Sequence, residues 1–385
     1  MIRINSFLHR DRLSDVIRRW MRDTLQPGDV DEILRLVHFN NVYVSRALGR
    51  FSADLFAGLH GAGLRMESVA TKGALRDRIS TTLPSHCARC AELVTAYAAQ
   101  PGYYFRETPF HGNLYFHDGQ GDACYVGSSR IKRIRRLAEK TARRLVDWLY
   151  AGDGTQPAGG IWQQQEAAPE ALQQAEQRLL AQLHDNPAVQ LPDGQAINDV
   201  AGLKVILEAH ELERLLSLLQ DGGCTLIEQE RHDGNYQATN LVVGYRPDKD
   251  FILAEPLHDR MLQVFNAHGY TPGQTNAAFR EFVRSGEASI NLEIIVTSYL
   301  EMLESEIGRC MHEERIIRQR HIPRYCGQLA QNAGFLMEFL FTYPALPLPR
   351  LDRLPVRIRD RYLPDTFDEV RRRLFGNPSV ELNER

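Results

Sequence analysis

The sequence lacks an apolar run long enough to cross a membrane, which takes about 20 consecutive residues. Its first residues, Met1-Ile2-Arg3-Ile4-Asn5, do not form the apolar core of a secretory signal peptide. Six cysteines spread over 385 residues are too few and too scattered for a disulfide framework. Together these absences predict a cytoplasmic protein with no membrane partner.

A large excess of charge of one sign is also missing, because the formal net charge is only −3. Such a chain is not expected to coat nucleic acid over its whole surface, so any basic patch must be local. The hydrophobic content of 43% and the charged content of 25% are ordinary for a globular protein. The length is sufficient for two or three domains.

A second Cys-x-x-Cys pair is absent, and this bears on metal binding. Cys87 and Cys90 have the spacing of half a zinc site, which Cys124, His111 and His117 could complete as a tetrahedral set. Buried free cysteines one helical turn apart explain the pair more simply. We therefore expect structural zinc to be unlikely.

What the sequence does contain is a basic stretch at residues 129–144. Apolar residues recur there at three- and four-residue steps, which predicts a helix with one apolar face. Lys132, Arg136 and Lys140 fall on the opposite face, one turn apart. Either these cations form a solvated face, or they bind an anionic partner.

Carboxylates at predicted strands follow downstream. Asp199 leads a nearly continuous apolar strand that runs to Leu207, and Glu293 lies in a second apolar strand at 289–296. Between them, strands at 225–230 and 237–243 flank the turn pair Asp233-Gly234. This order predicts an α+β fold with a mixed sheet.

Taken in order, these pieces resemble the synthetase domain of the RelA/SpoT family, over roughly residues 125–150 and 195–315. The family pattern reads Arg-x-Lys-x-x-x-Ser-Ile-x-x-Lys, then Asp-x-x-Gly/Ala-x-Arg, then Asn-Gly-Tyr-x-Ser-x-His, then Glu-x-Gln. The positions that match it are Arg130, Lys132, Leu137, Lys140, Asp199, Gly202, Tyr236 and Glu293. The resemblance implies a mixed β-sheet of nucleotidyltransferase type flanked by helices, with helical N- and C-terminal regions.

The resemblance also implies an activity, namely Mg²⁺-dependent transfer of pyrophosphate from ATP to the 3′-hydroxyl of a guanine nucleotide. Asp199 and Glu293 are then the catalytic and metal-binding carboxylates, and we expect them to lie close together although they are far apart in sequence. The expected phosphate- and nucleotide-binding residues are Arg130, Lys132, Arg136, Lys140, Lys204, Tyr236 and Asn240. Tyr236 would stack on the acceptor base.

The chain departs from the family pattern mainly on the acceptor side. Arg136 replaces the family serine, Lys204 the arginine, Asn240 the histidine and Ile295 the glutamine, while Gly234 and Asn235 stand in swapped order and Ala238 replaces the serine after the tyrosine. Donor binding is therefore better supported than guanine specificity. Besides GDP or GTP, the acceptor could be an adenine nucleotide or a tRNA end, as in toxin members of the family.

Two other functional hypotheses remain open. The chain could be a catalytically silent module of the same fold that binds or senses a nucleotide. Alternatively, it could be a helical scaffold whose basic residues bind the phosphate backbone of RNA by charge alone. An oligomer is possible in each case.

The expected organisation has three parts. Residues 1–120 form a mainly helical region, with separate helices expected at 30–37 and 52–57, and lack the paired His/Asp motif of the family's hydrolase domain. Residues 121–320 form the synthetase-like domain, with insertions at about 151–195 and 246–288, the latter holding two helices. Residues 321–385 form a helical region with a proline-rich strap.

Overall fold

The computed structural model describes most of the N-terminal three quarters of the chain. The described residues are 3–21, 26, 28–82, 87–104, 106–118, 123–132, 196–233 and 237–308, with isolated positions at 174, 177, 178 and 181. The rest of the expected insertion at 151–195, the region 321–385 with its proline-rich strap, and Arg136, Lys140 and Tyr236 lie outside them.

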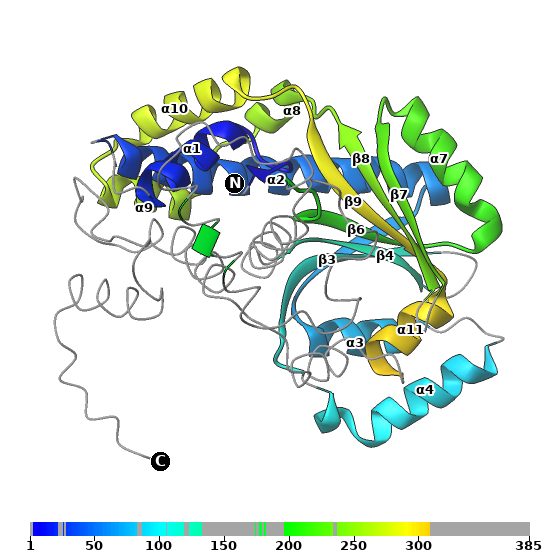
Figure 1. Cartoon of the computed structure of the whole chain (residues 1–385). Coiled ribbons are helices and arrows are strands. Elements are labelled where there is room, and N and C mark those ends of the chain that lie inside the picture. The colour runs from blue at the N-terminus through cyan, green and yellow to red at the C-terminus, as the bar shows by residue number, and fades with distance from the viewer. Residues whose placement is uncertain are drawn as a thin grey trace, which may run out of the picture.

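Helices and strands are interspersed along the described part of the chain (Figure 1). The strands are β1 (Arg3–Ile4), β2 (Leu64–Thr71), β3 (Pro109–Asp118), β4 (Ala123–Ile131), β5 (Ala196–Ile197), β6 (Ala201–Ile206), β7 (Thr225–Asp233), β8 (Gln237–Tyr245) and β9 (Ile290–Thr297). The α-helices are α1 (Arg10–Met21), α2 (Asp29–His60), α3 (Lys72–Ser80), α4 (Ala88–Ala99), α7 (Leu212–Asp221), α8 (Lys249–Ala254), α9 (Asp259–Ala267), α10 (Pro272–Ser285) and α11 (Tyr299–Ile307). Short 3₁₀ turns occupy Pro101–Tyr103 and Ala209–Glu211.

A seven-stranded sheet with the order β2-β3-β4-β6-β9-β8-β7 forms the centre of the described region. β6 and β9 pair in parallel, and every other neighbouring pair is antiparallel. The sequence prediction of an α+β fold with a mixed sheet is thus confirmed. β2 and β3 come from the region expected to be mainly helical, so the sheet continues across the expected boundary near residue 120.

Helices cover both faces of this sheet, and each face has its own core. On one face, α2 packs on β4 and β6, and the core there also takes side chains from α1 and from α7 to α10. On the other face, a smaller core joins β3 and β4 to α3, α4 and α11 (Figure 1). β6 is buried between the two layers, which explains its continuous apolar sequence.

Three sequence predictions about helices need correction. Ser129, Arg130 and Ile131 belong to β4 and not to the start of a basic helix. The second insertion contains three helices, α8, α9 and α10, where two were expected. The segments at 30–37 and 52–57, expected as separate helices, are both parts of α2.

The cysteine pair forms a disulfide, which corrects the prediction of two free cysteines. Cys87 and Cys90 are bonded to each other, and Cys87 precedes α4, where its sulfur accepts a hydrogen bond from the Cys90 backbone N–H. Among the described residues, no cluster of three metal-ligating side chains occurs.

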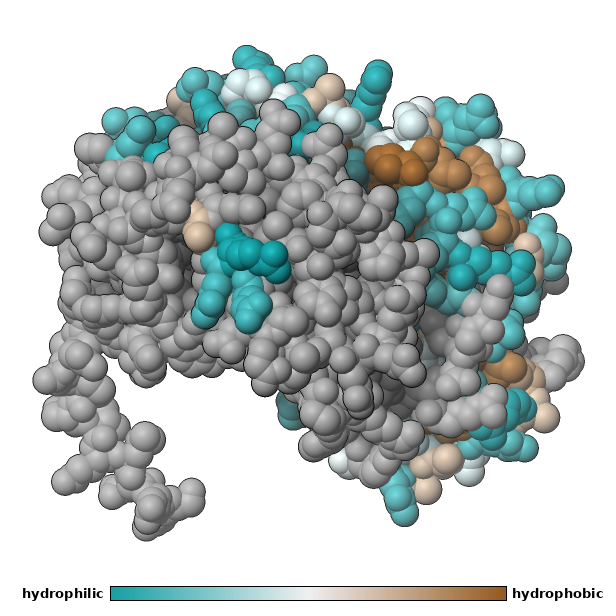
Figure 2. All heavy atoms as spheres, in the orientation of Figure 1, coloured by the Kyte–Doolittle hydropathy of each residue, from teal (hydrophilic) through white to brown (hydrophobic). Residues whose placement is uncertain are grey.

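The described surface is mixed in character. Leu226 and Ile227 on the edge strand β7 are about half exposed, and Figure 2 shows apolar surface at the upper right, over the region of β7 and β8. No helix of the described part is both long enough and apolar enough to span a membrane.

Candidate functional site

Four of the site residues predicted from the sequence, Arg130, Glu293, Lys204 and Asn240, lie in two rows that cross the sheet on the face covered by α3 and α11. In the first row, Gly202 on β6 stands between Arg130 on β4 and Glu293 on β9. Residues directly opposite each other in a sheet share a face, so these three positions point the same way. The second row contains Ser128, Lys204, Ile295 and Asn240, in the order β4-β6-β9-β8.

Lys132 joins the two predicted carboxylates. Its backbone N–H donates a hydrogen bond to the Val200 carbonyl at 2.7 Å, which holds the end of β4 beside the residue after Asp199. Its ammonium nitrogen lies 3.7 Å from Asp199 Oδ2 and donates a hydrogen bond to Glu293 Oε2. The structure thus brings Asp199 and Glu293 to one cation, and the three groups together carry one net negative charge.

The three side chains differ in their access to solvent. The exposed fraction rises from 9% for Glu293 to 19% for Lys132 and 30% for Asp199. A ligand that approaches from solvent therefore meets Asp199 first, whereas Glu293 forms the floor of the site. Glu293 lies across β6 because its neighbour there, Gly202, has no side chain to block it.

A second charged group lies deeper in the same layer, around Glu306 of α11. Lys72 Nζ donates to both carboxylate oxygens of Glu306, at 2.6 and 2.7 Å. Arg76 contacts the same carboxylate at 3.6 Å, and Lys204 Nζ lies 3.7 Å from Glu306 Oε1. One buried carboxylate is therefore shared by three cations from α3 and β6.

Burial and charge act in opposite directions on these groups. Burial opposes ionisation of Glu306, but the charges of Lys72, Lys204 and Arg76 outweigh it and hold the pKa of this carboxyl well below its ordinary value. For Lys204, burial dominates and lowers the pKa of the ammonium group. Burial therefore disfavours the charged form of Lys204, and a further anion nearby would stabilise that form.

A small pocket separates the two charged groups. Lys72, Arg130, Lys132 and Lys204 line it together with the carboxylates Glu293 and Glu306. Its volume is about 40 Å³, little more than the share of one liquid water molecule, which is about 30 Å³. A larger anion must therefore lie at its mouth.

Two cations of this lining, Arg130 and Lys72, lie over an aromatic ring. The Arg130 guanidinium lies 5.2 Å from the centroid of Phe110 on β3. Lys72 approaches the same ring, at 5.4 Å. Cation–π contacts of this kind orient a charged side chain without neutralising it. Arg130 therefore keeps its charge available to an anion in the pocket.

The structure places the predicted acceptor-side residues less completely. Asn240 is half-buried on β8, directly opposite Ile295, and Ile295 lines the pocket. Asn240 itself is not among the lining residues. Tyr236, Arg136 and Lys140 are outside the described part of the chain, so their roles stay predictions.

The sequence reasoning missed Lys72, Arg76 and Glu306, although each sits on an apolar helix face. Glu306 falls one turn after Met302 and Leu303, both of which are buried. Lys72 and Arg76 likewise share a helix face with buried Leu75 and Ile79. A charge at a core-facing position is costly unless it is paired, so these positions signalled a buried ionic contact.

The donor set of the site suits a hard divalent cation such as Mg²⁺. Mg²⁺ is usually held by one or two carboxylates together with substrate phosphates. Asp199 and Glu293 provide carboxylate oxygens, and the Lys132 ammonium between them shows that their joint position already attracts positive charge. The two carboxylates therefore fit this metal as part of a ligand set that phosphate oxygens would complete.

Comparison of the chain with protein-family models, with curated proteins and with solved structures gives no match.

Proposed function

We propose that this chain is an Mg²⁺-dependent pyrophosphokinase that uses ATP as donor and the 3′-hydroxyl of a nucleotide or an RNA end as acceptor. The observation that carries the proposal is the meeting of Asp199 and Glu293 at Lys132, beside a pocket lined by three further cations. Pyrophosphate transfer needs carboxylates for a metal and cations for a triphosphate, and both occur here within one layer of side chains.

The donor would bind across the first row of residues. Arg130, Lys132 and Lys204 all line the pocket, where their charges can contact phosphate oxygens. Binding a polyanion there would offset the cost of keeping Lys204 charged and buried. Lys132 would then exchange its contact with Glu293 for a contact with phosphate, which frees both carboxylates for the cation.

In the reaction, the acceptor 3′-oxygen attacks the β-phosphorus of ATP, the bond from that phosphorus to the bridging oxygen breaks, and AMP leaves with the electron pair. Glu293 is placed to take the proton of the acceptor hydroxyl, because it lies at the floor of the site next to Asp199. Bound Mg²⁺ would supply charge neutralisation for the transferring group. Arg130 and Lys132 would steady the phosphates during the transfer.

The acceptor side supports weak discrimination between bases. Ile295 offers no hydrogen-bonding group, and its cross-strand partner Asn240 offers one donor group and one acceptor group. Guanine nucleotides, adenine nucleotides and a tRNA end therefore all remain candidate acceptors. Tyr236 is the residue proposed to stack on the acceptor base.

One observation favours a second candidate, a silent module that binds a nucleotide without turnover. The Glu293 carboxylate already accepts a hydrogen bond from the Lys132 ammonium, so the ion pair could persist in the bound state. In that case the carboxylates would hold the lysine in place for phosphate binding and would not bind a metal.

The test is transfer of label from γ-labelled ATP in the presence of Mg²⁺ to GDP, GTP, ADP, ATP or deacylated tRNA. We expect label to appear on one acceptor as pyrophosphate, and Asp199→Asn to abolish the transfer. The matched control is Glu213→Gln. It removes an exposed carboxylate on α7, a helix that packs on the opposite face of the sheet, and should leave transfer unchanged.

Each alternative has its own outcome. ATP binding that depends on Lys132 but gives no transfer to any acceptor would favour the silent module. A folded protein that neither binds ATP nor transfers label would overturn both proposals.

A further inference from the structure

Asn198, the residue before Asp199, is held by two other asparagines. Its side-chain oxygen accepts a hydrogen bond from Asn5 Nδ2 at 2.7 Å and a second one from Asn291 Nδ2 at 3.1 Å. Asn291 lies on β9, two residues before Glu293. The Asn198 oxygen therefore links the segment that carries Asp199 to the strand that carries Glu293.

The N-terminal segment makes the same connection through its backbone. β1 pairs in parallel with β5, and the Asn5 N–H then donates to the Ile197 carbonyl at 2.9 Å. The Asn5 carbonyl in turn accepts a hydrogen bond from the Asn291 N–H at 3.0 Å. Asn5 thus stands between the two carboxylate-bearing segments: its backbone is bonded to both, and its side chain is bonded to Asn198.

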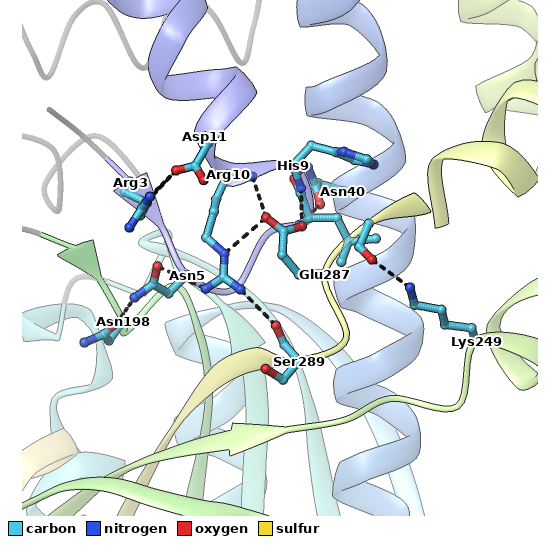
Figure 3. A network of polar contacts seen from close by, with 12 residues as sticks. Arg3, Asn5, His9, Arg10, Asp11, Asn40, Asn198, Lys249, Glu287 and Ser289 are labelled. Atoms are coloured by element: carbon cyan, nitrogen blue, oxygen red, sulfur yellow. Dashed lines mark hydrogen bonds and ion pairs between the residues drawn. The ribbon is translucent and has the colours of Figure 1, made fainter. Parts of the chain in front are cut away.

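A further layer of contacts fixes Asn5 itself (Figure 3). Arg10 donates to Asn5 Oδ1 at 3.3 Å and to the Ser289 carbonyl at 3.2 Å. Glu287 accepts hydrogen bonds from the backbone N–H of His9 at 2.6 Å and of Arg10 at 3.2 Å. These bonds tie the start of α1 to the residues just before β9.

The tie extends into the core of the other sheet face. Asn40 on α2 is fully buried, and it accepts from the Leu8 N–H at 2.7 Å and donates to the Leu8 carbonyl at 3.0 Å. Ser6 Oγ donates to the Asn291 carbonyl at 2.7 Å. The N-terminal segment is therefore anchored along its length and can act as a rigid support.

The short segment that carries Asp199 is fixed from two sides. The residues from Asn198 to Val200 are in neither β5 nor β6, and β5 contributes only two residues. From the side of the sheet, the hydrogen bond from the Lys132 N–H to the Val200 carbonyl fixes this short segment. From the opposite side, Asn5 and Asn291 fix it through Asn198.

We propose that Asn5, Asn198 and Asn291 are positioning residues for the carboxylate pair, so that the N-terminal segment sets the distance between Asp199 and Glu293. The inference rests on the proposed function for its effect on metal and ATP, but its geometric part can be tested without a ligand. In that view the N-terminal segment around Asn5 acts on the site through Asn198 and Asn291.

The experiment compares Asn198→Ala with Asn198→Asp in the full chain. Asn198→Ala removes the acceptor oxygen, whereas Asn198→Asp keeps an oxygen that can accept from both Asn5 and Asn291. The control is Asn276→Ala, which removes a half-buried asparagine on α10 whose side chain donates to the nearby Pro272 carbonyl at 2.9 Å.

The first measurement is amide hydrogen exchange without ligand. We expect Asn198→Ala to speed exchange of the Lys132 amide, which is bonded to Val200, while amides of the β8–β9 ladder keep the parent rates. Asn198→Asp should restore slow exchange. Uniformly faster exchange would mean general destabilisation, and unchanged exchange at Lys132 would mean that the asparagines do not hold this segment; either result overturns the inference.

The second measurement is the Mg²⁺ concentration that gives half-maximal ATP binding. Loss of a residue that orients a metal ligand commonly weakens metal binding by roughly ten- to hundredfold. We expect a shift of this size for Asn198→Ala, none for the control, and recovery in Asn198→Asp. An unshifted Mg²⁺ requirement in Asn198→Ala would overturn the inference even if exchange changes. If the parent protein binds no ATP at all, the proposed function fails, and the exchange result alone decides the geometric claim.

Discussion

Gly202 on β6 lies directly beside Glu293 on β9, so closely that a Cβ at this position would stand 3.2 Å from Glu293 Oε2. That distance is shorter than an ordinary van der Waals contact, and the nearest backbone oxygen would be 3.4 Å away. The absence of a side chain at Gly202 is therefore what lets the Glu293 carboxylate reach Lys132 across β6.

Replacement of Gly202 by alanine should move this carboxylate without unfolding the protein. The added methyl group would press on Glu293 Oε2 and tilt it away from Lys132 and Asp199, so we expect weaker Mg²⁺-dependent ATP binding at nearly unchanged melting temperature. The control is Gly49→Ala in α2, where no atom lies within 4 Å of the added Cβ. That change should stabilise the helix by about 1 kcal/mol. Equal ATP binding by Gly202→Ala and the parent would show that the Glu293 position is unimportant.

The buried carboxylate Glu306 should have the opposite profile, with a large effect on stability. Substitution by glutamine leaves Lys72, Arg76 and Lys204 without their shared anion, and breaking a buried ion pair in this way costs about 3–5 kcal/mol. Denaturant unfolding of Glu306→Gln measures this loss. Glu67→Gln is the matched control, because Glu67 pairs with Arg78 nearer the surface and should cost about 1 kcal/mol or less.

The same carboxylate predicts a pH dependence of stability. The pKa of Glu306 is lower in the folded protein than its ordinary value of 4.5, so its contribution is fully present above that value. It is lost as the pH falls below 4.5 toward the depressed folded pKa, because protonation removes the pairing with the lysines. The free energy of unfolding should therefore fall less steeply in this acid range for Glu306→Gln than for the parent. Parallel profiles would contradict the assignment.

These residues also show what the sequence could and could not predict. The α+β class and the carboxylate strands followed from local patterns, because β6 is covered on both faces and is therefore apolar except at Lys204. The pairing of Lys72 with Glu306 joins positions separated by 234 residues. No local pattern specifies such a partner, although a charge on an apolar helix face indicates that one exists.

The misplaced start of the basic helix has a different cause. From Ser129 to Lys132 the sequence has one apolar residue, Ile131, so its pattern does not separate a strand from the start of a helical stripe. Hydrogen bonding to β3 and β6 decides in favour of the strand. The helix prediction for the α2 region was wrong in another way, because two short helices were expected where one long helix forms. Asn40 and Gly49 both lie inside this helix, and the Asn40 side chain is hydrogen-bonded to the backbone of Leu8.

Lys204 allows stability and ligand binding to be separated. Burial lowers its pKa, which means that its charge is costly in the folded protein, while Glu306 retains Lys72 and Arg76 as partners without it. We expect Lys204→Met to unfold at the same temperature as the parent or higher. Its ATP affinity should drop by roughly ten- to hundredfold, as for the loss of a charged hydrogen bond of about 1.5–3 kcal/mol.

Calorimetry and melting curves on the same preparation test both parts of this prediction. Arg260→Met, which removes an exposed cation on α9, is the control and should change neither quantity. If Lys204→Met melts at a lower temperature but binds ATP normally, Lys204 contributes to stability and not to ATP binding.

Lys132 distinguishes a metal-dependent enzyme from a silent binding module. In the present arrangement its ammonium group occupies the place between Asp199 and Glu293, where a divalent cation would also find its charge balance. If the carboxylates are metal ligands, the lysine competes with the metal until phosphate draws it away. Lys132→Ala should then bind Mn²⁺, used as a spectroscopic substitute for Mg²⁺, more tightly than the parent when no nucleotide is present. The same variant should bind ATP with Mg²⁺ more weakly, since one phosphate contact is lost.

A silent module predicts a different pair of results for Lys132→Ala. Carboxylates that serve only to hold the lysine gain no metal when it is removed, so only the ATP affinity should fall. Opposite signs of the two changes thus support metal-dependent transfer, whereas loss of ATP binding with unchanged Mn²⁺ affinity would rule out the carboxylate pair as a metal site.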